Sequence, residues 1–392
     1  MARILVVTWD GGGNVPPMLG IAGELLRRGH QVRVLGHPQQ REVVVAAGLK
    51  FISYRHALPW APRAATTGTR VLLRFIFGPF TDPRLGRDVR DEIVREPVDL
   101  ALVDSMTLAG VRAAEQAKVP TAVLMHTFHR YHTHEWSRSP IGVVAAMRGM
   151  RPGRLWNAAD RVLVATDSAL DPATERRLPV NVRYTGVVQT PIQPGSPQAK
   201  PLVLVSLSTI FFAGLAETFQ AILDALEAQP IRGVVTTGAV APAALRAPAN
   251  VEVHQYLPHD EIMPSASMVV GHGGHSTTMR ALAHGMPLLI LPMNRITDQP
   301  MIGEAVFRAG AGRVLPKTAS PAEIRSAVGS LLQDPSYRDA AEAICARLRS
   351  KDGAAGAADE LECLLKTSAK SAAGECARYE ESLTGGSAST RR

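Results

Sequence analysis

Short apolar runs alternate with segments of helical spacing along this chain. Residues 3–8 (RILVVT) form a β-branched run, glycines follow at 11–13, and apolar positions at helical spacing then lead to Gly29. Further apolar runs of this kind occupy residues 32–37, 51–54, 99–105, 120–127 and 161–167. Strands that are buried on both faces and alternate with helices predict a parallel sheet with helices on both sides.

The pattern stops at a proline-rich segment and then starts again. Residues 189–197 (QTPIQPGSP) are polar, and each proline there fixes its own φ, which indicates a semi-rigid linker. Apolar runs then recur at residues 202–208, 232–237, 251–257, 267–274 and 287–293. The chain is therefore predicted to be an α/β protein with two Rossmann-like domains of doubly wound parallel sheet. The predicted N-terminal domain, linker, C-terminal domain and flexible tail are residues 1–188, 189–200, 201–368 and 369–392.

The composition narrows the classes of function. A hydrophobic fraction of 46% and a charged fraction of 20% are typical of a globular protein and exclude a coiled coil or a disordered chain. No apolar run reaches the roughly 18 residues of a membrane-spanning helix, and no signal peptide is recognised, so we expect a cytoplasmic protein. The formal charge is +8, but the basic residues are scattered and aromatic residues are only 5%, which argues against nucleic-acid binding. The three cysteines are Cys345, Cys363 and Cys376. They are too few, and lie too close to the C-terminus, to form disulfides or a zinc site in the body of the protein.

A glycine-rich turn between a predicted strand and a predicted helix has the pattern of an anion site. Residues 271–278 read GHGGHSTT. The glycines let a ligand approach the backbone, and the free N–H groups and dipole of the helix favour negative charge. An ordinary helix N-cap is the alternative explanation of the hydroxyl residues.

A carboxylate and an amide stand side by side after the next strand. Asp298 and Gln299 precede Pro300 at the expected carboxyl edge of the sheet, where open α/β sheets bind ligands. Together they supply the acceptors and donors that sugar hydroxyls need, although a helix cap would have the same residues.

These motifs resemble the donor-binding signature of inverting, nucleotide-sugar-dependent glycosyltransferases of the GT-B class, and most of all bacterial enzymes that decorate natural products. The resemblance is carried by HQYLPH at 254–259, GHGGHSTTMRALAHGMPLLILP at 271–292 and DQP at 298–300, while residues 1–37 and RYTGV at 183–187 also fit. It implies two domains that face each other across a cleft, with the acceptor in the N-terminal domain. The implied partners are a nucleotide-sugar donor and a small-molecule acceptor, and a homodimer is compatible with it.

The resemblance also implies a role for each residue of the donor site. The implied diphosphate contacts are Ser208, His272, Gly274, Ser276 and Thr277. The implied nucleobase contacts are Tyr256 and Leu257. The implied sugar-hydroxyl contacts are Asp298 and Gln299. Because the nucleotide sugar is a co-substrate, no cofactor is expected, and the lack of a D-x-D motif predicts a metal-independent reaction in which His272 and the helix N-terminus neutralise the diphosphate.

One departure from the family concerns the ribose. Many relatives carry Glu where this sequence has Arg280, and a carboxylate there would accept hydrogen bonds from a ribose diol. A 2'-deoxyribose lacks that diol, so Arg280 favours TDP-sugars over UDP-sugars. A solvated helix face is the alternative explanation of this arginine.

A second departure concerns the catalytic base. In the family a histidine in Gly-His-x-x-Pro removes the proton of the acceptor hydroxyl, and an aspartate on a later strand orients it. Residues 13–17 read GNVPP here, so Asn14 stands in the place of the base, whereas Asp104 keeps the place of its partner. Asparagine does not accept a proton at neutral pH, and general-base catalysis contributes ~10²–10⁴ in rate.

Four explanations of Asn14 stay open. Asp104 could be the base, or an acidic phenol, enol or carboxylic acid could be an acceptor that needs little help. Another group could act instead, with the candidates Asp10, His126, His129, His132 and His134. Finally, the protein could be a catalytically impaired or partner-dependent binder of a sugar nucleotide.

Two further hypotheses concern the N-terminal domain. The resemblance implies an acceptor pocket, and the candidates to line it are Trp60, Phe75, His126 and His129, of which the aromatic ones could equally be core. Metal binding by the histidines is disfavoured because no cysteine or adjacent aspartate completes a site. A nicotinamide-dependent oxidoreductase is also disfavoured, because prolines occupy the place of the third glycine of G-x-G-x-x-G.

Overall fold

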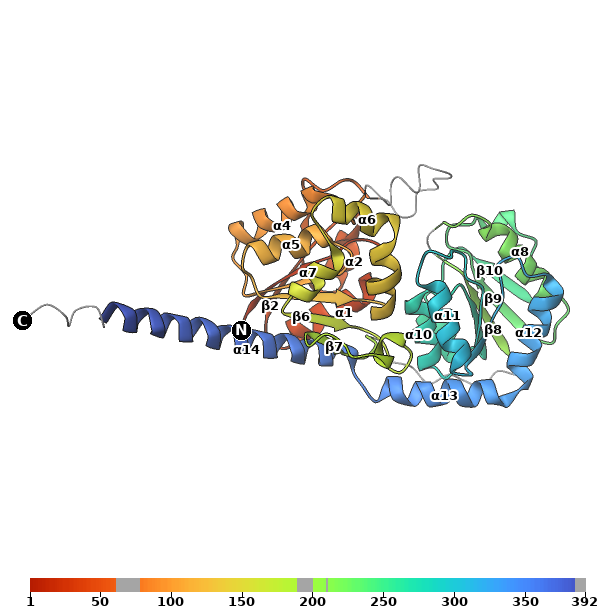
Figure 1. The fold of residues 1–392 in the computed structure, drawn as a ribbon. Coiled ribbons are helices and arrows are strands. Elements are labelled where there is room, and N and C mark those ends of the chain that lie inside the picture. The colour runs from red at the N-terminus through yellow and green to blue at the C-terminus, as the bar shows by residue number, and fades with distance from the viewer. Residues whose placement is uncertain (61–77, 189–199, 209–210, 385–392) are drawn as a thin grey trace, which may run out of the picture.

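Two parallel β-sheets with helices packed against them organise the chain in this computed structural model (Figure 1). The structure describes residues 1–60, 78–188, 200–208 and 211–384, with side chains up to residue 368. This architecture confirms the predicted fold class of two α/β domains with parallel sheets. The predicted linker falls almost entirely outside the described residues.

The N-terminal sheet, as far as it is described, has seven parallel strands in the order β3-β2-β1-β4-β5-β6-β7. Strands β1 to β7 are Arg3–Val7, Gln31–Gly36, Lys50–Ser53, Leu100–Asp104, Thr121–Met125, Arg161–Val164 and Val182–Tyr184. Helices α1, α2 and α4 to α7 are Val15–Arg27, Arg41–Ala46, Pro83–Arg95, Leu108–Gln116, Pro140–Met147 and Pro152–Ala158, and a π-helical turn, η2, is Tyr131–Trp136. Because the strand order reverses between β1 and β4, the loops after these two strands border one crevice.

The C-terminal sheet repeats this plan with six described strands in the order β10-β9-β8-β11-β12-β13. Strands β8 to β13 are Leu202–Ser206, Arg232–Thr236, Val251–His254, Met268–Gly271, Leu288–Ile290 and Gly312–Val314. Helices α8 to α14 are Leu215–Leu226, His259–Ile262, His275–Ala283, Gln299–Arg308, Pro321–Gln333, Pro335–Arg349 and Gly353–Thr384. Its order reverses between β8 and β11, so the loop after β8 and the glycine-rich turn after β11 are neighbours.

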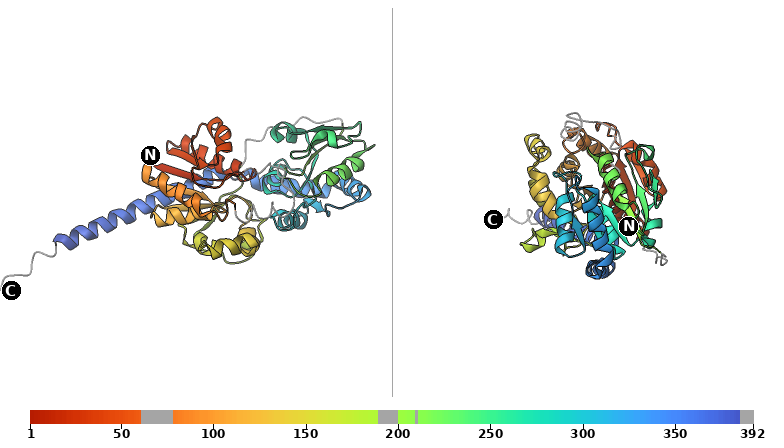
Figure 2. Two further views of the ribbon diagram at one scale, coloured as in Figure 1. Left: turned by 90° about the horizontal axis from the view of Figure 1, so that it is seen from above. Right: turned by 90° about the vertical axis from the view of Figure 1, so that its right-hand side faces the viewer.

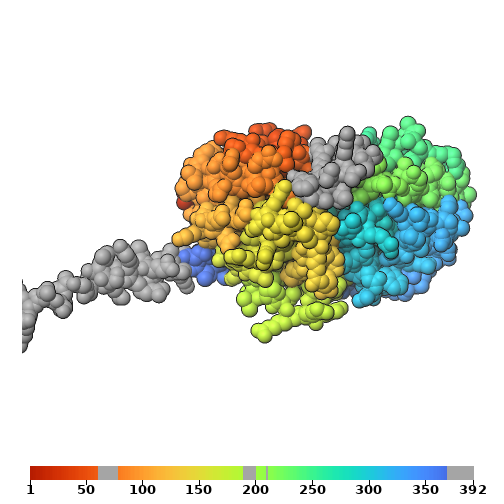
Figure 3. Space-filling model, turned by 45° about the horizontal axis from the view of Figure 1, so that its top comes forward, coloured from red at the N-terminus to blue at the C-terminus, as the bar shows by residue number. Residues whose placement is uncertain are grey.

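The sheets are buried on both faces, which is why their strands read as continuous apolar runs. In β1, Ile4 and Val6 belong to one core cluster, and Leu5 and Val7 belong to another. The second of these clusters also contains residues of the C-terminal sheet, such as Leu204. The two domains therefore share apolar contacts, and Figure 3 shows their surfaces meeting along a seam.

Two edge strands, β7 and β13, do not appear as separate apolar runs in the sequence. Strands β7 and β13 lie at the edges of their sheets and have three residues each, VRY and GRV. A central arginine and a length of three residues leave no apolar run to detect.

The C-terminal helix α14 does not follow the predicted division of the chain at residue 368 into a C-terminal domain and a tail. Helix α14 leaves the C-terminal domain and packs on the N-terminal domain, where Ala357 and Leu361 join the core cluster of β1 and α1 (Figures 1 and 2). Arg28, which follows α1, also pairs with Asp359 at 2.7 Å. The small residues at the start of α14 permit this close approach, since a Cβ at Gly353 would lie 2.5 Å from the carbonyl oxygen of Val187. The helix continues to Thr384, into the segment for which an aperiodic tail was predicted.

Within the described residues, no helix is both long enough and apolar enough to cross a membrane.

Candidate active site

Asn14 is locked in place at the start of α1. Its side chain is 1% exposed, and its Nδ2 donates to the carbonyl oxygen of Trp9 and to Oδ2 of Asp104, both at 2.9 Å. Its Oδ1 accepts the backbone N–H of Gly11 at 2.9 Å. Because the amide nitrogen faces two acceptors and the oxygen faces a donor, the orientation of the amide is unambiguous. Asn14 therefore holds the carboxylate of Asp104 in place, and its side-chain amide cannot accept a proton at neutral pH.

Asp104 lies at the carboxyl end of β4 and is 0% exposed. Its Oδ1 accepts the backbone N–H of Met106 at 2.9 Å, and its Oδ2 accepts the amide of Asn14. The same Oδ2 lies 3.6 Å from Nδ1 of His126. The carboxylate thus connects the glycine loop after β1 with the segment after β5.

That segment reaches the C-terminal domain. The side chain of His126 is 13% exposed, and its Nδ1 is enclosed by protein without a hydrogen-bond partner among the described residues. The next residue, Thr127, donates its hydroxyl to Oδ2 of Asp298 at 2.7 Å. Two adjacent residues therefore face the buried carboxylate of one domain and a carboxylate of the other.

The other histidines of this segment are set apart from Asp104 in different ways. His132, in η2, is fully buried with its ring centroid 5.8 Å from those of His126 and Trp156, and burial lowers its pKa well below the usual range. His129 is also buried, which lowers its pKa, whereas His134 is partly exposed and contacts Arg138. Among the described residues, no group of three or more His, Cys, Asp or Glu could hold a metal ion.

The glycine-rich turn after β11 brings His272 close to the start of α10. Gly273 has φ +84°, and a Cβ there would lie 2.8 Å from the carbonyl oxygen of Gln299. A Cβ at Gly274 would lie 2.5 Å from Nε2 of His272. Both glycines are therefore required by the close packing of the turn.

The His272 ring carries an unused polar atom. Its Nδ1 is buried without a hydrogen-bond partner among the described residues, and burial lowers the pKa of the ring to about 4. Such an atom at the positive end of a helix is a feature that an anionic ligand would satisfy. Ser276 and Thr277 lie in the first turn of the same helix and are half-buried.

The first turn of α10 also touches the N-terminal domain. A Cβ at Gly13 would lie 3.8 Å from the Cβ of Ser276. His275 pairs through Nε2 with the hydroxyl of Thr166 at 2.8 Å, and its ring meets that of Phe128 edge to face at 6.0 Å. Thr166 and Phe128 belong to no motif, and their partner His275 is far away in the chain, so these two contacts could not be predicted from the sequence.

Asp298 and Gln299 are adjacent in the chain but differently engaged. Asp298 accepts the hydroxyl of Thr127, and burial raises the pKa of its carboxyl. Gln299 is buried, and its Oε1 accepts the backbone N–H groups of Met293 and Asn294 at 2.7 and 3.1 Å. The amide oxygen of Gln299 thus shapes the loop before α11, and only the carboxylate of Asp298 faces the N-terminal domain.

The residues expected at the nucleobase lie at the same edge of the C-terminal sheet. Tyr256 is 72% exposed, and Leu257 is half-buried against the core. Ser208 follows β8 and is half-buried. Arg280 in α10 pairs with Asp260 at 3.0 Å, so it has a specific partner beside this edge.

The aromatic residues of the N-terminal domain form a packed wall. Trp60 is buried, meets Trp9 edge to face at 5.9 Å and donates its indole N–H to the carbonyl oxygen of Asp10. Phe80 contacts both tryptophan rings, at 4.7 and 6.3 Å. Phe75, the other aromatic candidate, lies outside the described residues.

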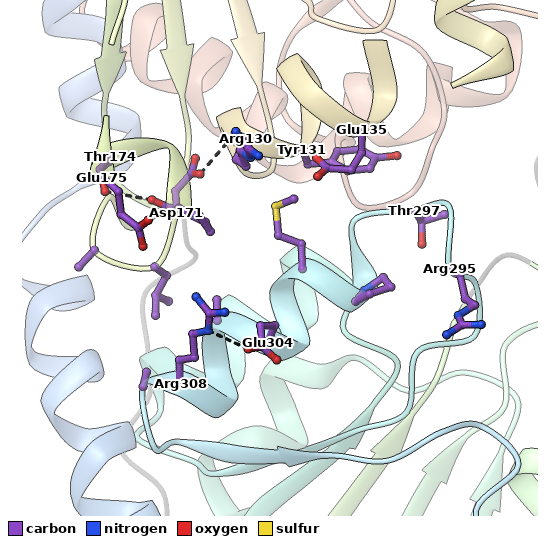
Figure 4. Close-up of a pocket in the computed structure, with 17 residues that line it drawn as sticks. Arg130, Tyr131, Glu135, Asp171, Thr174, Glu175, Arg295, Thr297, Glu304 and Arg308 are labelled. Carbon is purple, nitrogen blue, oxygen red and sulfur yellow. Dashed lines mark hydrogen bonds and ion pairs between the residues drawn. The ribbon is translucent and has the colours of Figure 1, made fainter. Parts of the chain in front are cut away.

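A cavity of about 650 Å³ opens on the seam between the domains (Figure 4). Residues of both domains line it, including Tyr131 and Asp171 on one side and Thr297, Met301 and Arg308 on the other. None of the candidate site residues predicted from the sequence lines it, although Thr297 and Pro300, which flank the Asp298-Gln299 pair, do. We regard it as a neighbour of the candidate site, because the buried polar groups described above lie elsewhere.

The arrangement of the two domains is that of GT-B glycosyltransferases. The solved glycotransferase of kitacinnamycin superposes with a TM-score of 0.78 at 23% identity, covering 93% of this chain and 99% of that one. The solved glycosyltransferase VinC in complex with dTDP superposes with a TM-score of 0.70 at 20% identity, covering 93% of this chain and all of that one. The fold is therefore GT-B.

Sequence similarity narrows the class. Residues 221–364 match the family model of the erythromycin biosynthesis protein CIII-like C-terminal domain. The chain is 26% identical to 4'-demethylrebeccamycin synthase of Lentzea aerocolonigenes over 93% of its own length and the whole of that protein. This protein is a glycosyltransferase similar to enzymes of antibiotic biosynthesis.

Proposed function

We propose that this glycosyltransferase is inverting and metal-independent, and that it moves a sugar from a TDP-sugar to a small natural-product acceptor. The observation that carries the proposal is the meeting of two half-sites. The anion-binding turn of His272 lies on one domain and the buried Asp104 on the other, and the hydrogen bond from Thr127 to Asp298 joins them.

The C-terminal half-site suits a nucleoside diphosphate. The backbone N–H groups at the start of α10 and the hydroxyls of Ser276 and Thr277 offer donors to phosphate oxygens, and His272 lies beside them. These groups stabilise the charge that develops on the leaving diphosphate, a role that a divalent cation has in other transferases. Tyr256 offers an exposed ring face for a pyrimidine.

The N-terminal half-site suits an acceptor. It places Asp104 across the seam from the diphosphate turn, and Asp298 at the junction is available to sugar hydroxyls once Thr127 releases it. An acceptor oxygen on the side of Asp104 would attack the anomeric carbon from the face opposite to the diphosphate, which inverts its configuration. Enclosure between the domains would limit hydrolysis of the donor.

The preference for a deoxyribonucleotide rests on Arg280. In the sequence, Arg280 stands where many relatives carry the glutamate that would hold a ribose diol, and in the structure it is paired with Asp260. VinC, which has the same fold, was solved with dTDP. We expect TDP to bind more tightly than UDP by about tenfold, which corresponds to about 1.4 kcal/mol.

Calorimetric titration with TDP and UDP tests this proposal directly. In Arg280→Glu, the new carboxylate should accept the ribose diol and shift the preference toward UDP. The matched control is Arg280→Gln, which removes the same ion pair with Asp260 without adding a carboxylate and should leave UDP weak. Tighter binding of UDP by the wild type would contradict the TDP preference, and no binding of either nucleotide would overturn the donor site.

A further inference from the structure

The candidate active site contains the buried carboxylate of Asp104, but Asn14 stands in the place of the histidine that this carboxylate would orient. Both amide hydrogens of Asn14 are donated, and its oxygen is used by Gly11. Asp104 is fully enclosed, so its oxygens do not reach a ligand in the crevice. The proton of an acceptor hydroxyl must therefore pass to another group.

One imidazole stands against this carboxylate from the other side. Nδ1 of His126 is 3.6 Å from Oδ2 of Asp104, and the carboxylate is its only evident partner among the described residues. That separation exceeds a hydrogen bond by a few tenths of an ångström, as is common for catalytic pairs before the substrate is bound. With Nδ1 enclosed and the ring 13% exposed, Nε2 is the ring nitrogen left to face the crevice.

The surroundings of His126 place it between the two half-sites. Asp104 from β4 faces it on one side and His132 from η2 on another, with ring centroids 5.8 Å apart. On the side of the C-terminal domain lie Asp298 and His275, and the proximity of His126 acts to lower the pKa of each, beside the larger effect of burial. The neighbouring Thr127 bonds to Asp298 itself.

Asn14 gives this pair its geometry. By donating to Oδ2 of Asp104, its amide fixes the carboxylate on the same edge that His126 meets. The backbone N–H of Met106 holds the other oxygen. An imidazole therefore still lies beside the buried carboxylate, as in the histidine–aspartate pair of the family that the sequence resembles. Here the imidazole comes from the segment after β5 instead of the loop after β1.

We propose, on the basis of the proposed function, that His126 is the general base of the transfer reaction and that Asp104 orients it. Nε2 takes the proton of the acceptor hydroxyl as the acceptor oxygen forms its bond to the anomeric carbon. The bond from that carbon to the diphosphate oxygen breaks, and the nucleoside diphosphate leaves with the electron pair. Asp104 stabilises the imidazolium through Nδ1–H.

The test compares His126→Asn with His134→Asn. Asparagine at 126 retains a donor toward Asp104 but cannot take up a proton, and His134 is a partly exposed histidine of the same segment. With TDP-glucose as donor and 4-methylumbelliferone or cyclohexanol as acceptor, we expect His126→Asn to lower kcat/KM by ~10²–10⁴, and more strongly for the alcohol than for the phenol. His134→Asn should remain within about twofold, and both variants should bind TDP as the wild type does.

The pH profile and chemical rescue distinguish a base from a structural residue. The wild type should lose kcat/KM at low pH as one group is protonated, and His126→Asn should lack that limb. In His126→Ala, added imidazole should restore part of the turnover, a result that a merely misfolded protein would not give.

Three outcomes would overturn the proposal in recognisably different ways. Wild-type turnover in His126→Asn together with an inactive Asp104→Asn would make Asp104 the base. Turnover equal to that of the wild type in both His126→Asn and Asp104→Asn would show that the acceptor needs no base. A wild type that binds TDP but neither transfers nor hydrolyses TDP-glucose would overturn the proposed function as well.

Discussion

At the scale of single residues, the contact between Gly274 and His272 is the most exacting feature of the candidate donor site. The backbone at Gly274 has φ −64° and ψ 132°, which any residue adopts, so only the space taken by the ring demands glycine. In Gly274→Ala the new methyl group would displace the imidazole, and we expect TDP affinity to fall about tenfold or more. Calorimetry checks this against Gly23→Ala in α1, where a Cβ meets nothing within 4 Å. Equal affinity in both variants would show that the ring position is irrelevant to binding.

A second prediction at the scale of residues concerns the buried His275. Burial at the seam lowers the pKa of His275 from 6.5 to about 3, so the folded protein binds fewer protons there than the unfolded chain. The stability that this group contributes is fully present above pH 6.5 and is lost as the pH falls toward 3. Between these values the free energy of unfolding should fall by about 1.4 kcal/mol per pH unit because of this group.

Urea unfolding at a series of pH values measures that slope. His275→Gln should show a shallower loss of stability between pH 6 and 4 than the wild type, whereas His56→Gln, which removes an exposed histidine, should follow the wild type. A steep slope retained in His275→Gln would assign the acid sensitivity to other groups.

At the scale of elements, helix α14 fastens the end of the chain to the N-terminal domain. Its first turn passes so close to residues 186–187 that a Cβ at Gly353 would lie 2.5 Å from backbone atoms of Val187. We therefore expect Gly353→Ala to destabilise the protein by about 1–3 kcal/mol, because backbone cannot yield as a side chain does. Urea unfolding measures it beside Gly329→Ala in α12, where the added methyl group meets nothing within 4 Å and should stabilise by up to about 1 kcal/mol. A neutral Gly353→Ala would mean that α14 detaches easily.

At the scale of the whole molecule, a few polar contacts and a shared apolar core hold the two domains in one arrangement. The hydrogen bonds from Thr127 to Asp298 and between His275 and Thr166 cross the seam, as does the ion pair of Arg347 with Asp167 at 2.9 Å. The first of these ties up the carboxylate expected to meet the sugar. Under the proposed function, binding of the donor would exchange this contact for one with a sugar hydroxyl, which would link occupancy of the site to the packing of the domains.

The sequence by itself determined the fold class and the position of the glycine-rich turn at His272. Apolar strands of a parallel sheet and glycines before a helix are local patterns, so the strands around β1 and β11 and the turn at His272 could be predicted from neighbours in the chain. The absence of a base at Asn14 was equally visible, because a motif of five residues carries it.

Only the tertiary structure decided which histidine lies beside Asp104 and on which domain helix α14 packs. The pair of Asp104 and His126 depends on two strands lying side by side, and the bond from Thr127 to Asp298 joins residues of different domains. Helix α14 returns to the first domain through Ala357, Ala358, Leu361 and Leu364, and the spacing of these residues does not show which domain they contact. Periodicity reports which face of an element is buried, but contacts between distant residues depend on strand order and on how closely the domains approach.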